Sequence, residues 1–287
     1  MKRLKRFVLK SIASTPKAVY SPEPNKSQLV GVVIPTLVRD LIQLEQAVTS
    51  ALANNCVGVV VLVTPSKNKE KLQLFSNKSA VEIIFDELPG FTNAMNIGVN
   101  HLNKMGYKYF SGIGDDDLLA PNFLDSIIVK MESQGAQVGL GTCYYVNNYN
   151  QIIFRNSSPL YLLRILHLIP NIIPAPGALI RTSSWVAAGG FNPRFKYVAD
   201  FDFWMKIRGN SKFTRLPIPM SYFRWHDLGL TAGNREASRA EALLAQRNYI
   251  PRSQVPLFYT FTKASYLLGD FVMRISMRSS FKADPKK

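Results

Sequence analysis

The sequence has few of the residues that mark several common protein classes. It holds only two cysteines, Cys56 and Cys143, among 287 residues, so a disulfide scaffold is excluded and both are expected to be reduced thiols or at most one bridge. Two cysteines and three histidines allow no zinc-finger spacing. The chain lacks the roughly 20 uninterrupted apolar residues of a spanning helix. Its early apolar run, residues 7–9, is too short for a signal peptide, so neither a membrane-spanning nor a secreted protein is expected.

Acidic residues are also scarce. The chain has 19 Asp and Glu against 35 Lys and Arg, a formal net charge of +16. Such a protein is attracted to polyanions, which include nucleic acids, anionic membrane surfaces and phosphorylated substrates. The positive charge is spread along the chain and increases at both termini, and it does not cluster with aromatic residues on one element. A nucleic-acid-binding module is therefore not favoured, and we expect no nucleic-acid partner.

Apolar runs alternate with helical patterns in the first 120 residues. Buried strands are predicted at residues 29–35, 57–63, 81–85 and 107–113, and helices at 41–52, 67–78 and 92–105. This alternation predicts an α/β fold with a mostly parallel central sheet flanked by helices. Ligands of such sheets bind at the carboxyl ends of the strands.

The chain divides into three predicted parts. Residues 1–27 form a basic N-terminal arm and linker, residues 28–235 the main domain, and residues 236–287 a C-terminal helical segment. Within residues 257–278 the charged side chains fall in one stripe of a helical wheel, so this helix either packs on the protein's core or lies on an anionic membrane. The apolar, proline-rich segment 160–176 also has two interpretations. It either contacts a lipid-linked acceptor or the bilayer face, or packs under the C-terminal helix.

Three neighbouring carboxylates follow the fourth predicted strand. Asp115, Asp116 and Asp117 repel one another, and their pKa values rise unless a cation neutralises them. A solvated loop can carry such a triplet at little cost. Its position at the end of a buried strand instead favours Mn²⁺ or Mg²⁺, hard ions that bind carboxylate oxygens and substrate phosphates.

Six segments resemble motifs of the family 2 glycosyltransferases and occur in that family's order. They are Val30–Thr36, Gly90–Gly98, Tyr109–Pro121, Gly177–Arg181 with Gly189–Asn192, Ala199–Trp204 and Tyr222–His226. Each match is weak alone, and their shared order makes the set specific. The resemblance implies a GT-A (Rossmann-like) fold and inverting transfer of a sugar from a nucleotide-diphosphate donor, with Mn²⁺ or Mg²⁺ as cofactor.

The resemblance also implies roles for individual residues. It makes Asp200 the general base, with Asp202 the next acid. The metal would be held by Asp115, Asp116, Asp117 and His226; the nucleotide by Pro35, Thr36, Val38, Thr64, Asn93, Asn96 and Asp115; and the diphosphate or sugar by Arg224, Gly177 and Trp204. Four of these residues also have an alternative, structural interpretation: a helix N-cap for Asp200, a helix-start residue for Asn93, core packing for Trp204 and a surface salt bridge for Arg224.

Several positions depart from the family pattern. Thr64 stands where an Asp pair usually follows the second strand, Met95 replaces an arginine, and Ala199 replaces the glutamate beside Asp200. Gly114 stands where many relatives have the first acid, so the register of the DxD motif on the triplet stays open. These changes weaken the case for uracil recognition and leave a catalytically degenerate sugar-nucleotide-binding protein as an alternative. A sugar nucleotidyltransferase is another, although the loop after the first strand lacks the glycine-rich pattern it needs.

The charge and the apolar segments together predict a place of action. We expect a cytoplasmic enzyme, peripheral on the inner face of the cell membrane, that extends a polyprenyl-linked glycan acceptor in surface-polysaccharide assembly, of capsule or lipopolysaccharide type. The sequence carries no signal for the oligomeric state.

Overall fold

The structure is a computed structural model of the chain. It describes residues 29–88, 90–147, 149–226, 229–230, 232–250, 255, 258–259, 261–262, 264–269 and 271. The predicted basic arm, residues 1–27, lies outside the described residues, as do the charged residues of the predicted C-terminal stripe, Lys263, Asp270, Arg274 and Arg278.

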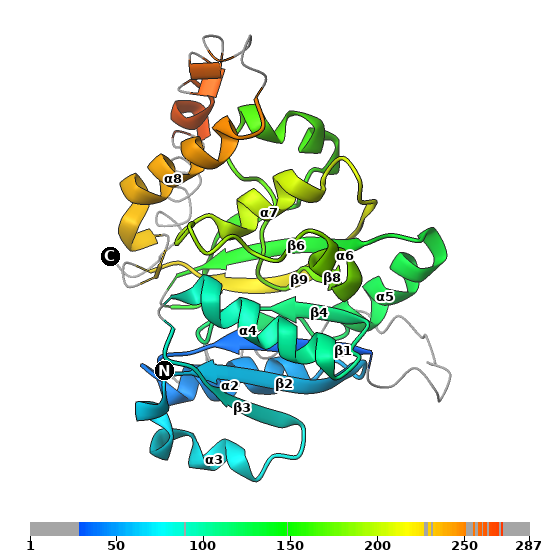
Figure 1. Cartoon of the computed structure of the whole chain (residues 1–287), viewed down its shortest axis with the longest axis vertical. Helices are drawn as coiled ribbons and strands as arrows, with labels where there is room; N and C mark the ends of the chain where they lie inside the picture. The colour runs from blue at the N-terminus through cyan, green and yellow to red at the C-terminus, as the bar shows by residue number, and fades with distance from the viewer. Residues whose placement is uncertain are drawn as a thin grey trace.

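Alternating strands and helices build the first half of the central sheet (Figure 1). The strands are β1 (Val30–Pro35), β2 (Val57–Thr64), β3 (Val81–Phe85) and β4 (Tyr109–Gly112), and the helices are α2 (Leu41–Leu52) and α4 (Phe91–Lys104). The four strands are parallel in the order β3-β2-β1-β4. All four predicted strands form. The predicted helix at 67–78 is instead broken into η1 (Ser66–Asn68), η2 (Glu70–Leu72) and α3 (Gln73–Ser76).

Helices cover both faces of this half. In Figure 1, α4 lies on the near face of the sheet and α2 on the far face, as right-handed crossovers on the two sides of β1 require. Helix α4 packs closely on β1 and β2 because Gly98 has no side chain: a Cβ there would lie 2.4 Å from Val33 Cγ1.

The second half of the sheet mixes strand directions. Its elements are β5 (Leu118–Leu119), α5 (Phe123–Gln134), β6 (Val138–Val146), β7 (Ile152–Asn156), η3 (Leu160–Leu168), β8 (Leu179–Arg181), α6 (Thr182–Ala187), α7 (Ala199–Ile207), β9 (Phe213–Arg224), η4 (Ala232–Asn234) and α8 (Arg235–Arg247). The sheet continues from β4 in the order β8-β6-β9-β5, and β7 pairs with β6. Strands β6 and β9 share the direction of β1–β4, and β5, β7 and β8 oppose it. The predicted α/β fold with a mostly parallel sheet flanked by helices is confirmed.

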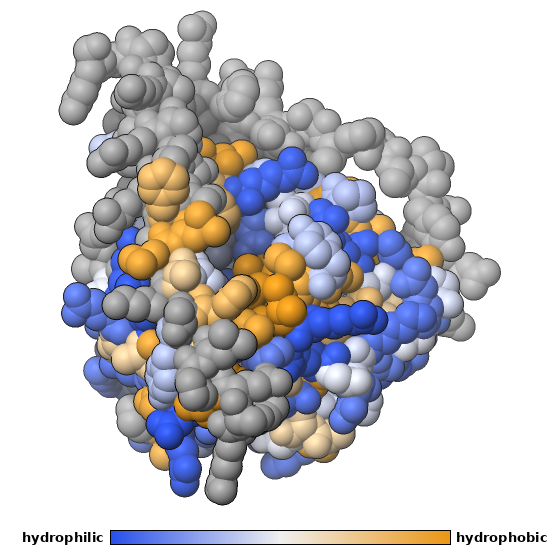
Figure 2. Space-filling view, turned by 90° about the horizontal axis from the view of Figure 1, so that it is seen from above, coloured by the Kyte–Doolittle hydropathy of each residue, from blue (hydrophilic) through white to orange (hydrophobic). Residues whose placement is uncertain are grey.

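The apolar segment 160–176 packs against the protein's own C-terminal helices. The Gln246 amide of α8 donates to the carbonyls of Leu166 and Ile169, at 3.4 and 2.7 Å, and the Ser265 hydroxyl donates to the Leu168 carbonyl at 3.2 Å. This end of the molecule still exposes apolar side chains, and Figure 2 shows hydrophobic and polar residues side by side on this face. Its large exposed apolar residues include Tyr161, Ile165, Tyr259, Phe261, Leu267, Leu268 and Phe271. Across the described part of the chain, we find no helix of the length and apolarity that a bilayer crossing demands.

Candidate functional site

The acidic triplet begins where the strand order reverses. Thr36 follows β1 and Asp115 follows β4, its parallel neighbour, and the Thr36 hydroxyl donates to Asp115 Oδ2 at 2.6 Å. The same Thr36 oxygen accepts the backbone N–H of Val38 at 2.9 Å, which holds Val38 at a φ of 52°. Burial raises the pKa of Asp115, while the bond from Thr36 lowers it and the charge of Arg39 does so too. The tight turn from Thr36 to Val38, with the positive charge of Arg39 nearby, thus lies at the point where the strand order reverses.

The middle acid faces the end of the last strand. Asp116 Oδ2 lies 2.6 Å from His226 Nε2. The Arg224 guanidinium donates to the carbonyl oxygen of Asp116 and, at 2.8 Å, to Gln46 Oε1. Short strand β5 pairs antiparallel with β9 through Leu118 and Tyr222, and this pairing brings residues about 110 positions apart into contact. Carboxylate, imidazole and guanidinium therefore converge at the carboxyl end of the sheet.

The third acid points inward. Asp117 is 2% exposed, and its two oxygens accept backbone N–H groups, Gly114 at 3.2 Å and Arg224 at 2.9 Å. Burial, together with the charge of Asp116, raises its pKa well above the usual value. Both oxygens are used to join the triplet loop to β9, so the contacts do not support the prediction that Asp117 ligates a metal.

Asp200 lies in the first turn of α7 and accepts a hydrogen bond from the Asn171 side-chain amide at 3.0 Å. Its side chain does not cap the helix, because the N-cap is Val198 and no side chain bonds there; the N-cap alternative is wrong. A carboxylate at a helix N-terminus normally has a lowered pKa. Here burial dominates and raises the pKa of Asp200 to about 6.

Two other predicted residues of α7 face its packed side. Asp202 is 2% exposed and pairs with Lys206 at 3.1 Å, and the Tyr249 hydroxyl donates to it at 3.0 Å. Trp204 is fully buried and packs edge-on against Phe203. A fully buried ring offers no face to a ligand, so the predicted sugar contact of Trp204 is not supported. The alternative interpretation, that Trp204 packs in the core, agrees with its position.

The remaining predicted residues divide between the site and the packing. Pro35 ends β1 and is buried, and Asn93 is half-buried in the first turn of α4. Thr64 is 1% exposed and accepts from Asn68 at 2.9 Å. Asn96 uses both ends of its amide on the backbone of Phe191, at 2.8 and 3.0 Å, so its predicted nucleotide contact would have to replace these bonds.

Gly177 is a packing residue next to the triplet loop. It has a φ of 84°, and its N–H donates to the Gly112 carbonyl at 3.0 Å. A Cβ there would lie 3.0 Å from both Leu119 Cδ2 and Ser221 Cβ. The glycine therefore lets β4, β5 and β9 approach one another, and its buried position leaves the predicted sugar contact without support.

An aromatic cluster that the sequence analysis did not identify lies at the ends of β6 and β9. Tyr145 packs against Phe223 and Trp225, with ring centroids 5.2 and 5.8 Å apart. Burial raises the pKa of Tyr145, and so do the nearby charges, which include Asp200 and Asp117. Because both carboxylates act on one hydroxyl, the structure brings Asp200 to the same end of the sheet as the triplet. The alternating aromatic residues of 222–225 were the available sequence signal.

Comparison with known proteins gives a consistent class. No family model matches the chain. An uncharacterized glycosyltransferase of Rickettsia typhi is 24% identical over 191 residues, covering 63% of this chain, and one of Rickettsia prowazekii is 24% identical over 207 residues, covering 66%. The chain spans 59% of the length of each of these relatives. It is glycosyltransferase-like in sequence.

Solved structures extend the likeness to the fold. The crystal structure of S. aureus TarS 1-349 aligns with a TM-score of 0.54 at 15% identity, covering 78% of this chain and 73% of that one. The same protein in complex with UDP-GlcNAc aligns with a TM-score of 0.52 at 16% identity, covering 71% and 60%. At these identities the likeness establishes the fold.

Proposed function

We propose that this chain is an inverting glycosyltransferase, which moves a sugar from a nucleotide-diphosphate donor to a hydroxyl group of a glycan acceptor. The observation that carries the proposal is the meeting of two pairs, Thr36 with Asp115 and Asp116 with His226, at the point where the strand order reverses. Ligands of α/β sheets bind there. The UDP-GlcNAc complex of a similar fold supports a donor of this class.

The donor site would use the turn after β1 and the cations around the triplet. Backbone groups of Pro35, Thr36 and Val38 would contact the nucleotide, with Asp115 toward the ribose. Arg39, whose charge acts on Asp115, and Arg224 would face the diphosphate. Two arginines so placed offset the cation lost where Met95 replaces the family's arginine.

The residues present fit a divalent metal, and we infer that Asp116 and His226 would hold Mn²⁺ or Mg²⁺. Among the described residues, no three His, Cys, Asp or Glu side chains are placed so that they could hold a metal ion together. Mg²⁺, however, commonly binds through one or two carboxylates and completes its shell with water and substrate phosphates. Two facing side chains are therefore sufficient. Such an ion neutralises charge that gathers on a departing diphosphate.

Asp200 is the proposed general base. As the acceptor oxygen bonds to the anomeric carbon, its proton passes to the Asp200 carboxylate, and the bond from that carbon to the diphosphate oxygen breaks. Attack from the face opposite the leaving group inverts the configuration. Ala199 removes the family's acidic neighbour, but burial outweighs the hydrogen bonds that lower the pKa of Asp200 and raises it to about 6. This makes Asp200 a stronger base than an ordinary aspartate.

The acceptor would lie on the aromatic cluster. Phe223 and Trp225 are half-buried, closely precede His226 in the chain and offer apolar ring faces, and rings of this kind stack on sugars. We also propose that the acceptor is polyprenyl-linked and that the protein acts at an anionic membrane surface. The net charge of +16 and the exposed apolar side chains near the C-terminus support this.

The rate of transfer is expected to rise with pH through about 6, the pKa of Asp200. Only the ionised carboxylate can accept the acceptor's proton, so kcat/KM should increase about tenfold per pH unit below 6 and level off above pH 7. The measurement is release of the nucleoside diphosphate between pH 5 and 8. An acid limb centred near pH 4, the ordinary value for aspartate, would remove Asp200 from this role.

A thermal-shift panel tests the proposed donor class. Nucleoside diphosphates of the five common bases and UDP-GlcNAc are each added with and without Mn²⁺. One base should raise the unfolding midpoint by about 5–10 °C at 100 times its dissociation constant, and Mn²⁺ should increase the effect. Stabilisation without turnover on any acceptor would favour the degenerate alternative. No stabilisation by any nucleotide would overturn the proposal.

A further inference from the structure

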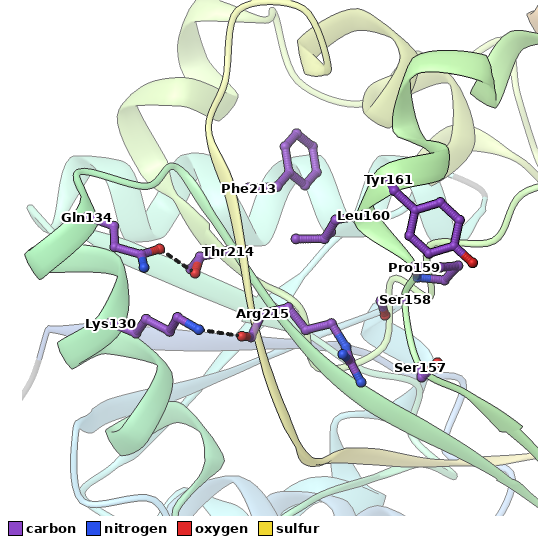
Figure 3. A pocket seen from close by; sticks show the side chains of 10 residues that line it. All are labelled: Lys130, Gln134, Ser157, Ser158, Pro159, Leu160, Tyr161, Phe213, Thr214 and Arg215. Carbon is purple, nitrogen blue, oxygen red and sulfur yellow. Dashed lines mark hydrogen bonds between the residues drawn. The ribbon is translucent and has the colours of Figure 1, made fainter.

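A cavity of about 440 Å³ opens on another part of the molecule than the proposed donor site (Figure 3). Its walls come from α5, from the loop that joins β7 to η3, and from the first three residues of β9. Arg224, at the donor site, is the last residue of the same strand. The paired strand β6 covers the same stretch with six residues, because Arg215 lies opposite Leu140 and Arg224 lies opposite Val146. At about 3.3 Å per residue, Arg215 and Arg224 are therefore roughly 20 Å apart. The cavity is therefore separate from the donor site.

The cavity has positive charge and no negative charge in its lining. Lys130 and Arg215 are its charged residues, and none of the ten lining residues is acidic. The Lys130 ammonium uses one hydrogen bond on the Arg215 carbonyl, at 2.8 Å, out of three donors. Arg215 Nε is buried and has no hydrogen-bond partner. A buried donor without a partner is uncommon and costs stability, and an anion with several acceptor oxygens would satisfy it.

The rest of the lining suits a sugar better than a small inorganic ion. In Figure 3, Leu160 points toward Phe213, Ser157 lies lower on the loop wall, and the Tyr161 ring lies beside Leu160 with its hydroxyl directed away from Phe213. Tyr161 is 80% exposed, so its ring face is available at the rim. Mixed hydroxyl and ring surfaces match the polar edges and apolar faces of a pyranose ring.

The loop that forms one wall has a fixed shape. Ser158 is fully buried, its hydroxyl donates to the Gly141 carbonyl at 3.0 Å, and its N–H donates to Asn156 Oδ1 at 3.0 Å. On the opposite wall, the Thr214 hydroxyl donates to Gln134 Oε1 at 2.7 Å. Both walls are held by bonds within the protein, so the cavity exists before a ligand enters.

We propose that this cavity binds an anionic carbohydrate, a sugar unit that carries a phosphate or a carboxylate. Arg215 and Lys130 hold the anion, and Tyr161 with Leu160 and Phe213 receives the ring. This site goes beyond the proposed transfer reaction and does not depend on it, because none of its residues belongs to the donor site.

Calorimetric titration of the full chain tests the site with four probes: glucose 6-phosphate, glucuronate, inorganic phosphate and glucose. Both anionic sugars should bind saturably, whichever of the two has the higher affinity. Glucose should bind at least tenfold more weakly than either of them. Arg215→Met should lower the affinity for the anionic sugars about tenfold or more. The matched control is Arg164→Met, which removes an exposed arginine of η3 outside the lining and should leave affinity within twofold.

Three outcomes would overturn the proposal. They are no saturable binding of either anionic sugar, inorganic phosphate binding as tightly as the sugars, and equal losses in Arg215→Met and Arg164→Met. If Arg215→Met fails to fold, Ser157→Glu supplies the same test, since a carboxylate in the lining repels the anion without removing a cation. Titration with UDP-GlcNAc runs in parallel. It should be unchanged in these variants, so failure of the cavity proposal is distinguishable from failure of the donor proposal.

Discussion

Replacing Asp200 with Asn is expected to slow sugar transfer by about 10²–10⁴-fold, the usual contribution of a positioned general base, with donor affinity within a few fold of the parent. Asn keeps the size of the side chain and can still accept the Asn171 amide bond, but it cannot take a proton from the acceptor. The measurement is kcat for nucleoside-diphosphate release, with the donor dissociation constant determined by titration. Full activity in Asp200→Asn would remove this residue from the base role.

Asp202→Asn is the matched control for that variant. It changes an acid two positions away in the same helix, whose carboxylate pairs with Lys206 and Tyr249 on the packed side. Loss of the ion pair with Lys206 and of the charge on the acceptor of the Tyr249 bond should lower the free energy of unfolding by about 1–3 kcal/mol, while kcat stays within a few fold. A large loss of kcat in a folded Asp202→Asn protein would transfer the base role to Asp202.

Stability distinguishes the two variants as well. Because burial raises the pKa of Asp200 to about 6, the native state binds more protons than the unfolded state between pH 4 and 6. The contribution of Asp200 to stability therefore falls as pH rises through that window. At pH 7 the Asn variant avoids a half-buried, partly desolvated charge and should unfold at the same temperature as the parent or higher. The inactive variant is thus expected to be the stable one.

Asp116→Asn is expected to abolish the effect of Mn²⁺ on donor binding and to reduce transfer by about 10²-fold or more. Asn offers a neutral oxygen in place of a carboxylate, so the proposed two-residue metal site loses its charged ligand. The bond from Arg224 goes to the backbone carbonyl of Asp116 and survives the substitution. Thermal stabilisation by the donor, measured as a function of Mn²⁺ concentration, reports the loss. An unchanged Mn²⁺ dependence would exclude Asp116 from the metal site.

Two companion variants locate that effect. His226→Gln removes the imidazole 2.6 Å from Asp116 and should weaken the Mn²⁺ dependence in the same way. Asp117→Asn places an amide against the backbone N–H groups of Gly114 and Arg224, so one of those bonds is lost and the protein should be destabilised by about 1–3 kcal/mol. Its remaining folded fraction should keep the parent's Mn²⁺ dependence. Loss of that dependence in Asp117→Asn would return Asp117 to the metal site.

The first half of the sheet was predictable from the sequence, and the second half largely was not. Strands β1 and β2 are valine-rich and buried on both faces, so short apolar runs identify them. Strand β9 contains Pro217 and Pro219, which argue against an interior strand. It forms because its pairing with β6 shifts register near Pro219, and because β5 pairs only at Ser221 and Tyr222.

The sequence indicated where a site lies but not its geometry, and several of the predicted site residues pack inside the protein. The position of Asp115–Asp117 after a buried strand indicated a binding site. Which acid faces which partner depends on the contact of β5 with β9, whose residues are more than 100 positions apart, and no local pattern encodes it. The inward turn of Asp117 and the raised pKa of Asp200 both come from burial, which only the folded chain defines.

The pairing of β5 with β9 has a consequence for how the protein is made. A ribosome releases the N-terminal strands first, and domains tend to form in that order during synthesis. The triplet emerges early, yet the groups that hold it, the Arg224 backbone and the His226 ring, are translated more than 100 codons later. Until then its three like charges stand together without those partners. In a nascent chain stalled before residue 221, we therefore expect the β1–β4 sheet to be nearly complete but unable to bind the proposed sugar nucleotide.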